Sequence, residues 1–348
     1  MTSPTSGSVG LATRDVRRDL LVMAGFTALY APYVAHAAVT RAFWLDELFT
    51  FYIVTMPDWT GMFDLIRRGP DQNPPLFYVV TRLLVGCFGE SEWVFRLPAM
   101  VGYWVLCVAL YFLGRRLGGS PVGLVAMATP VLTAAVYYAG EARPYGLALG
   151  AVGFGAACRR LAEVRTWRPW ATAGLAGGLG LAVALHYLAL LPVAVLWVLE
   201  VIQSRRRRRV SWAIWGGLLS PLLVLALHWP WLHGQARLPF WKTALSWREV
   251  WDFYHWLLSP PECLWLALMV GGATVLAQRT ALSPPACPNA YEWTAAGLSF
   301  ALLPPIGWMF VLKLTGKTFF ADRYLLATSA GLALLAAYPL RRIEVRHG

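Results

Sequence analysis

The stretch that decides the fold class is LPAMVGYWVLCVALYFLGRRLGGSPVGLVAMATPVLTAAVYYAG, residues 97–140. Its two runs 97–114 and 121–140 contain no charged residue, and a short basic turn with Arg115 and Arg116 separates them. Each run has about the 18 residues that a helix needs to cross the roughly 30 Å hydrocarbon core of a bilayer. The stretch therefore predicts two membrane-spanning helices joined by a tight turn.

The composition of the whole chain extends this conclusion. Of the 348 residues, 58% are hydrophobic and 14% are charged, whereas globular proteins carry roughly a quarter charged residues. A further long run without charge covers 169–199. The chain is therefore expected to be an integral membrane protein with several spans, and a soluble protein is excluded.

The net charge of +12 does not indicate a nucleic-acid partner. The basic residues lie mainly in short loops between apolar runs, where positive charge acts as a topology signal. The five cysteines show no CxxC or Cys/His spacing, so neither a metal site nor a disulfide framework is indicated. Cys87 and Cys263 would both lie near the outer surface, and the sequence does not decide whether they form a disulfide bond.

Apolar runs and helix breakers together predict eleven helices: 20–40, 75–88, 97–114, 121–139, 144–160, 170–185, 187–203, 211–229, 261–278, 294–312 and 323–340. The segment 75–88 carries Arg82 and would rise only about 21 Å, too short for a comfortable span. If 75–88 lies in the interface and the other ten cross, 18 of the 30 basic residues lie on the side of the N-terminus. The positive-inside rule favours that arrangement. We therefore predict an all-α polytopic membrane protein of ten transmembrane helices with both termini in the cytoplasm.

This topology produces two long external loops in a single domain over 1–348. The first loop covers 41–96 and includes 75–88 as an amphipathic helix on the outer face. The second covers 230–260, and its stretch 245–257, LSWREVWDFYHWL, alternates aromatic and charged residues. Such a pattern is typical of a helix in the headgroup region.

The segment FWLDELFT, 43–50, places two adjacent carboxylates, Asp46 and Glu47, where lipid meets water. A carboxylate in partly desolvated surroundings has a raised pKa and can act as a general base. A solvated start of the external loop explains the same pair without any chemistry, and the pair alone does not distinguish the two.

Two further segments put ionisable groups at the outer edges of predicted spans. In YYAGEARPYGLALG, 137–150, Glu141 and Arg143 either face a cavity or pair with each other. In KLTGKTFFADRYLLA, 313–327, Lys317 and Arg323 are cations suited to a phosphate, or interfacial anchors. Together, the acids and cations predict one outward-facing cavity equipped to move a sugar from a phosphate leaving group to a hydroxyl.

The chain resembles the GT-C-fold glycosyltransferases of the protein O-mannosyltransferase and lipid A aminoarabinose transferase type. The matching segments run in order along nearly the whole chain: LDE at 45–47, NPPLFYVVTRLLVGCFGESEWVFRLPA at 73–99, GRRLGG at 114–119, EARPYGLAL at 141–149, HYLALL at 186–191 and DRYLL at 322–326. One departure is Asn73, which stands where many relatives have His or Lys before the Pro-Pro step.

The resemblance implies an inverting transfer from a polyprenyl-phosphate-linked sugar to an acceptor hydroxyl on the extracytoplasmic face of the plasma membrane. It places Asp46 in the position of the catalytic base, beside Glu47, with Glu141 as the second acid. It matches Arg323, and more loosely Lys317, to phosphate-binding cations. We further predict Arg143, Tyr145, His186 and Tyr324 as substrate- or phosphate-binding residues, with an interfacial anchor as the alternative for His186. Asp46 and Glu141 could share a divalent cation, although nothing in the spacing demands one.

Two other classes of function compete with this interpretation. A transporter or lipid flippase would need paired ionisable groups at mid-membrane and usually inverted repeats, and neither is visible in the sequence. A non-catalytic membrane protein would explain the spans but not the carboxylates and cations at their edges. The sequence leaves the sugar and the acceptor (protein, lipid or polysaccharide) open.

Overall fold

The computed structural model describes residues 6–235, 247–259, 290–307, 309 and 321–342, and within these ranges all regular elements are helices. In chain order these are α1 (Ser6–Thr40), α2 (Leu45–Val54), α3 (Trp59–Arg67), α4 (Pro75–Phe88), α5 (Glu92–Gly118), α6 (Ser120–Ala128), η1 (Thr129–Leu132), η2 (Ala134–Gly140), α7 (Tyr145–Leu161), η3 (Arg165–Trp167), α8 (Arg168–Leu185), η4 (Tyr187–Ala189), α9 (Leu190–Arg207), α10 (Trp212–Leu227), α11 (Trp229–Gln235), α12 (Trp247–Leu258), α14 (Ala290–Ala301), η5 (Asp322–Tyr324), α16 (Thr328–Ala337) and η6 (Tyr338–Arg342).

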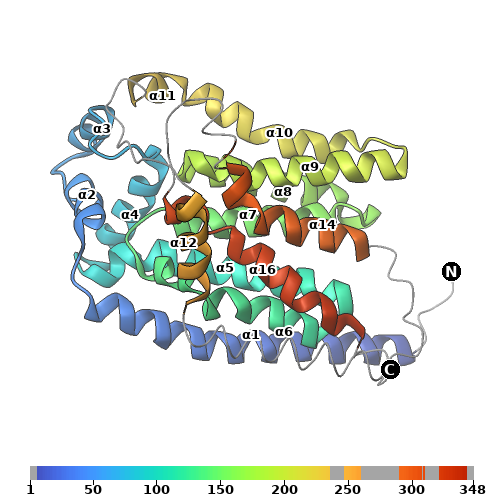
Figure 1. Cartoon of the computed structure of the whole chain (residues 1–348). Helices are drawn as coiled ribbons and strands as arrows, with labels where there is room; N and C mark the ends of the chain where they lie inside the picture. Colours follow the sequence, from blue (N-terminus) through green and yellow to red (C-terminus); the bar gives the residue numbers. More distant parts are fainter. Residues whose placement is uncertain (1–5, 236–246, 260–289, 308, 310–320, 343–348) are drawn as a thin grey trace.

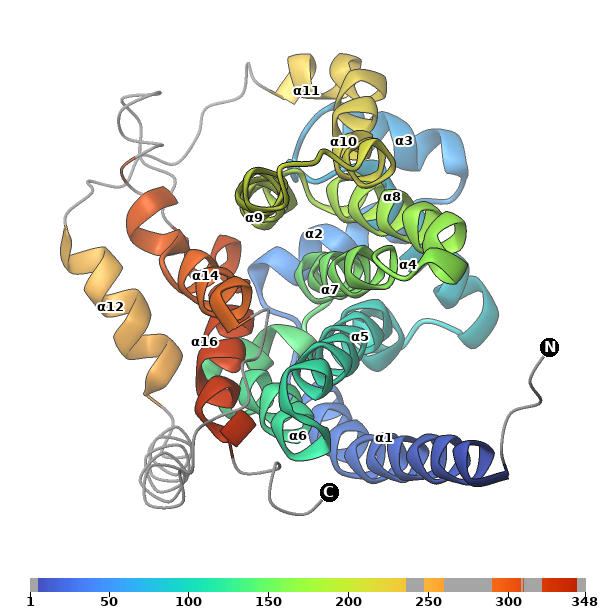
Figure 2. The same ribbon diagram turned by 90° about the vertical axis from the view of Figure 1, so that its right-hand side faces the viewer.

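The long helices lie side by side along one axis of the molecule (Figure 1). Seen along that axis, α7 lies between α5 and α8, and α1 packs at the periphery (Figure 2). The start of α1 and the end of α16 lie at the right-hand end in Figure 1, and α2, α3 and α4 form the opposite end. The first loop is thus at the far end of the bundle from the start of α1, as the predicted topology requires.

Fewer helices qualify as spans than the ten predicted. By length and composition, three helices among the described residues could cross a membrane: Val16–Thr40, Glu92–Gly118 and Tyr187–Arg207. Shorter apolar helices include Trp212–Leu227 and Thr328–Leu340. The predicted helix 261–278 lies outside the described residues. The chain is an integral membrane protein, and the count of ten spans stays a prediction.

The predicted helix 121–139 is not a straight rod. Its two parts, Ser120–Leu132 and Ala134–Gly140, meet at an angle of 75°. Thr133 at the break has extended backbone angles, φ −103° and ψ 161°, and Pro130 just before it cannot donate a backbone hydrogen bond. The bend turns the chain across the bundle end and so positions the segment with Glu141.

The first loop contains two helices, α2 and α3, in addition to the predicted 75–88. Helix α4 has the predicted bounds: Pro75 occupies its first turn and Gly89, with φ of 86°, ends it. Arg82, the residue that made this segment too polar for a span, donates to the carbonyl oxygens of Val54 and Met56 at 2.7 and 2.6 Å. Its cation therefore satisfies carbonyls at the C-terminus of α2.

The second predicted interfacial segment is also helical. Helix α12 buries Val250, Phe253 and Leu257 along one face and leaves Trp247 and Trp251 exposed. This spacing is that of an amphipathic helix. The stretch 236–246 of the same loop lies outside the described residues.

Close contact between α5 and α7 depends on two glycines. A Cβ atom on Gly102 would lie 2.2 Å from Leu147 Cα, and one on Gly150 would lie 2.2 Å from the Gly102 carbonyl oxygen. Small residues let helices in membranes approach to backbone contact. The central helix α7 can therefore pack directly on α5.

We expect Gly150→Ala to lower the thermal stability of the detergent-solubilised protein, because overpacking at a backbone contact costs about 1–3 kcal/mol or more. Thermal unfolding followed by tryptophan fluorescence measures the effect. Gly177→Ala in α8 is the matched control, since nothing lies within 4 Å of its Cβ position. Equal stability of the two variants would show that α5 and α7 are not packed this closely.

Candidate active site

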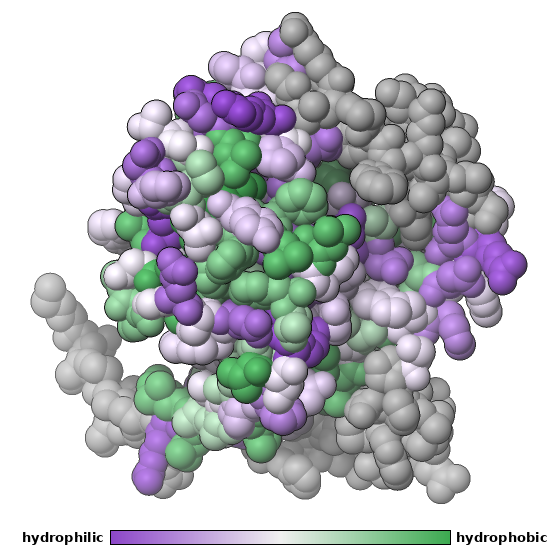
Figure 3. All heavy atoms as spheres, turned by 90° about the vertical axis from the view of Figure 1, so that its left-hand side faces the viewer, coloured by the Kyte–Doolittle hydropathy of each residue, from purple (hydrophilic) through white to green (hydrophobic). Residues whose placement is uncertain are grey.

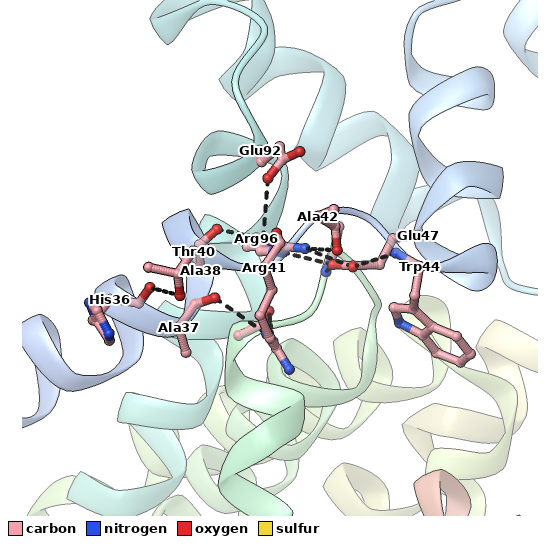
Figure 4. Close-up of polar contacts among 12 residues, drawn as sticks. His36, Ala37, Ala38, Thr40, Arg41, Ala42, Trp44, Glu47, Glu92 and Arg96 are labelled. Atoms are coloured by element: carbon pink, nitrogen blue, oxygen red, sulfur yellow. Dashed lines mark hydrogen bonds and ion pairs between the residues drawn. The ribbon is translucent and has the colours of Figure 1, made fainter.

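A buried ion pair between Glu47 and Arg96 fixes the end of the bundle that carries the first loop (Figure 4). Arg96 is 0% exposed and Glu47 is 1% exposed. Arg96 donates from Nε to Glu47 Oε1 and from Nη2 to Glu47 Oε2, both at 2.8 Å. Its Nη1 also donates to the carbonyl oxygens of Ala38 and Arg41 at 2.5 and 2.7 Å. The guanidinium thus joins the end of α1, the start of α2 and the start of α5.

The carboxylate of Glu47 accepts two backbone hydrogen bonds as well. The amide of Ala142 donates to Oε1 at 2.7 Å, and the amide of Trp44 donates to Oε2 at 3.3 Å. Both oxygens are therefore committed to structural contacts. These contacts position α2 and the turn before α7, and the catalytic role of Glu47 stays a prediction.

Its neighbour Asp46 faces a different partner. The Oδ2 atom of Asp46 lies 3.1 Å from Nη1 of Arg323, and both side chains are partly exposed. Arg323 comes from η5, at the outer start of the last predicted span. The structure thus brings together two residues 277 positions apart that the sequence analysis had placed in one cavity.

Arg143 contacts the same site through the backbone of Asp46. Its Nη1 donates to the backbone oxygen of Asp46 at 2.9 Å. Its guanidinium also forms a bidentate pair with Asp71, with Nη2 3.0 Å from Oδ1. Asp71 in turn accepts from Asn73 Nδ2 and from the Tyr78 hydroxyl, each at 2.7 Å. The alternative of a Glu141–Arg143 pair is therefore wrong, because Asp71 is the partner of Arg143.

Glu141 is a fully buried carboxyl between these groups. Neither of its oxygens has a hydrogen-bond partner among the described residues. Burial, with the negative charge of Glu47 as the next cause, raises its pKa to about 8, although Arg41 and Arg143 oppose the shift. Asp46 is close enough to contribute to the same shift. Glu141 is therefore mainly protonated at neutral pH.

A pocket of about 330 Å³, including its open mouth, adjoins the Asp46–Arg323 pair. Arg323, Tyr324, Tyr145 and His186 form its polar side, and the rest of the lining comprises the apolar residues Ala148, Leu149, Val152, Leu188, Ala189, Pro192, Leu326 and Ala327. Burial, and secondly the charge of Arg143, lowers the pKa of His186 to about 3, so its imidazole is neutral. The pocket therefore has a polar side with the cation of Arg323 and an apolar wall.

Aromatic contacts hold the polar side of the pocket together. The His186 ring lies 5.2 Å from the Tyr145 ring and 5.7 Å from the Tyr324 ring, measured between centroids. These three residues come from α7, the end of α8 and η5. The predicted binding residues Tyr145, His186, Arg323 and Tyr324 thus meet in one place, whereas Lys317 lies outside the described residues.

Sequence reasoning missed Arg96 and Asp71 as parts of the site. Arg96 follows a charged stretch at the start of α5, and Asp71 stands three residues before the first proline of the Pro-Pro step. Each is an ionisable residue at the edge of an apolar helix, which is the signal that singled out Glu141 and Arg323. Applied to the first loop residue by residue, that signal would have found both.

The side chains around Asp46 and Glu141 do not support the divalent cation that the sequence suggested. Within the described parts of the chain, no three His, Cys, Asp or Glu side chains group together as metal ligands. Asp46 is opposed by a guanidinium, and Glu141 is mainly protonated. The residues present do not fit a metal ion, and the chemistry of this site is derived from side chains alone.

Comparison with known proteins identifies the fold that carries this site. Residues 72–231 match the family described as dolichyl-phosphate-mannose-protein mannosyltransferase. The crystal structure of ArnT from Cupriavidus metallidurans in the apo state matches at a TM-score of 0.60 and 15% identity, over 96% of this chain and 60% of that chain. The chain has the GT-C fold.

A second crystal structure of ArnT from Cupriavidus metallidurans, bound to undecaprenyl phosphate, matches at a TM-score of 0.58 and 15% identity, over 97% of this chain and 60% of that one. No curated protein sequence matches the chain. The chain thus spans about 60% of the length of the solved GT-C structures that it resembles. The resemblance drawn from the sequence motifs is confirmed at the level of the fold.

We expect Glu47→Ala to destabilise the protein severely, because it removes the buried, bidentate partner of Arg96 and leaves the guanidinium only the more distant, half-exposed carboxylate of Glu92. Breaking a buried pair in this way typically costs about 3–5 kcal/mol. Thermal unfolding in detergent measures the loss. Glu92→Ala is the control, since Glu92 also pairs with Arg96, at 3.7 Å, but is 44% exposed and should contribute below about 1 kcal/mol. Comparable losses in both variants would contradict the role given to Glu47.

The raised pKa of Glu141 predicts a pH dependence of stability. Between its ordinary value and about 8, the unfolded chain releases this proton and the folded chain retains it. The contribution of Glu141 to stability should therefore fall as pH rises through that window and level off above it, and the fall should be clearest above pH 6.5, where the opposite contribution of His186 has ended. Thermal unfolding temperatures measured from pH 5 to pH 9 check the slope. Glu141→Gln, which stays neutral, should flatten it, and an unchanged slope in that variant would assign the titration to another group.

Proposed function

We propose that this protein is an inverting glycosyltransferase that moves a sugar from a polyprenyl-phosphate donor to an acceptor hydroxyl. The observation that carries the proposal is the Asp46–Arg323 pair beside a pocket that Arg323 lines and that has an apolar wall. A general base and a phosphate-binding cation are the two groups that such a transfer needs. ArnT, with the same fold, has been crystallised with undecaprenyl phosphate, which supports a donor of that chemical class.

Asp46 is the proposed general base. Its carboxylate takes the proton of the acceptor hydroxyl while the acceptor oxygen forms a bond to the anomeric carbon. The bond between that carbon and the phosphate oxygen breaks, and its electron pair leaves with the polyprenyl phosphate. Attack opposite the leaving group inverts the configuration at the anomeric carbon.

Arg323 is the proposed ligand of the leaving phosphate. Its Nη1 faces Asp46, while its buried Nε has no hydrogen-bond partner among the described residues. The guanidinium thus retains a donor for a phosphate oxygen, and Arg binds phosphate well because its donors form a planar fork. Tyr145, the neutral His186 and Tyr324 would contact the donor at the same mouth.

The apolar wall of the pocket suits the first isoprene units of the donor. It is built from one face of α7 and the start of α9, together with Leu326 and Ala327. The prenyl chain would leave between these helices and enter the lipid.

The orientation of the site follows from charge. With both termini in the cytoplasm, the end formed by α2, α3 and α4 lies on the extracytoplasmic side of the plasma membrane. Figure 3 looks onto that end, where hydrophilic residues are interspersed with hydrophobic ones. A mixed surface of this kind suits a site that exchanges a polar acceptor with water.

The decisive test is Asp46→Asn, which keeps the shape of the side chain but removes the base. We expect loss of transfer by a factor of about 100 or more, the usual contribution of general-base catalysis. Mass spectrometry of envelope glycans and glycoproteins, in cells lacking the gene and complemented with each variant, measures transfer. Thermal shift of the purified protein with undecaprenyl phosphate measures donor binding, which Asp46→Asn should leave intact.

Two further variants complete the comparison. Arg323→Gln should weaken the undecaprenyl phosphate shift and also reduce transfer. Asp64→Asn, which changes an exposed carboxylate of the same loop, should leave both measurements unchanged. Wild-type glycans in cells that carry Asp46→Asn would remove Asp46 from the role of base, and an unchanged envelope in cells lacking the gene would overturn the proposed function.

A further inference from the structure

A second cavity lies at the end of the bundle opposite the candidate active site. It encloses about 600 Å³, including its open mouth, between the C-terminal halves of α7 and α9 and the start of α14. In Figure 2 these helix ends face the viewer. The walls are mainly apolar, with Leu199 and Ala296 among them, and Arg159, Arg160, Gln203 and Trp293 supply the polar part. This volume and lining are those of a ligand site.

The charges around the mouth favour an anion. Arg159 is committed to Glu200, with Nε 2.9 Å from Oε2, and to Gln203. Arg160 contacts Glu163 at 3.1 Å and covers the Trp293 ring at 5.5 Å. Two more arginines, Arg116 and Arg207, contact Arg160 and Glu163 respectively. Among the side chains that the structure describes here, four guanidinium groups therefore face two carboxylates, which is a local excess of positive charge.

Exposed tryptophans place this mouth at the depth of lipid headgroups. Trp167, Trp170 and Trp212 begin or precede α8 and α10 at this same end and are 58–80% exposed. Tryptophan gathers at membrane–water interfaces. The run Arg205–Arg209 ends α9 beside them, as expected where anionic headgroups lie.

We propose that this cavity binds one anionic phospholipid from the leaflet at the end of the bundle opposite the candidate active site. An acyl chain fills the apolar part between α7, α9 and α14, and the phosphate lies at the mouth near Arg160. The cavity size, its apolar walls and the excess of guanidinium groups each match one part of such a lipid. The site shares no lining residue with the candidate active-site pocket.

Native mass spectrometry of the delipidated full-length protein tests the proposal, with phosphatidylglycerol and phosphatidylcholine as probes. We expect one phosphatidylglycerol to bind at least about fivefold more tightly than phosphatidylcholine, which corresponds to one well-placed basic residue. Arg160→Gln should abolish this preference. Ala296→Trp, which fills the cavity, should abolish tight binding of both lipids.

Controls separate the alternatives. Leu298→Trp adds the same side chain at a position of α14 that is 46% exposed and should bind like the wild type, as should Asp46→Asn. Equal binding of the two phospholipids, or an unchanged preference in Arg160→Gln, would overturn the proposal, and so would displacement of phosphatidylglycerol by inorganic phosphate. If Ala296→Trp unfolds on heating well below the wild type, the Arg160→Gln comparison decides alone.

Discussion

The buried pair of Glu47 and Arg96 is the constraint on which the candidate active site depends. Removing two charges from water costs several kcal/mol per ion, and only close geometry with further hydrogen bonds offsets it. Here the pair is bidentate, three carbonyl groups accept from the guanidinium, and two backbone amides donate to the carboxylate. Because these partners belong to four separate segments, satisfying one ion pair fixes the ends of all four.

Glu47 and Asp46 are adjacent at the start of α2 but differ in role: Glu47 holds the helix in place, and Asp46 is the proposed base. Successive side chains on a helix point about 100° apart, so Glu47 can face Arg96 while Asp46 faces Arg323. The backbone oxygen of Asp46 is held by Arg143, which is itself anchored by Asp71. The carboxylate proposed to take a proton is thus positioned through its backbone, and its Oδ2 faces Arg323.

Sequence patterns predicted the features that depend on residues close together in the chain. The Pro-Pro step and the length of 75–88 gave the bounds of α4, and ionisable residues at span edges pointed to Asp46, Glu141 and Arg323. The pairs Glu47–Arg96 and Asp71–Arg143 join residues 49 and 72 positions apart, and no local pattern specifies such partners. The 75° bend at Thr133 and the helical state of α2 and α3 were missed for the same reason, because packing at the bundle end decides them.

The isolation of Glu141 explains which acid can serve as the base. Its backbone is held on both sides, since Arg41 donates to the Gly140 carbonyl at 2.6 Å and the Ala142 amide donates to Glu47. The side chain is fully buried, and burial keeps it mainly protonated at neutral pH. A protonated carboxyl cannot take the acceptor's proton but can donate a hydrogen bond. Asp46, which is paired with a guanidinium and partly exposed, is therefore the acid that fits the proposed role of base.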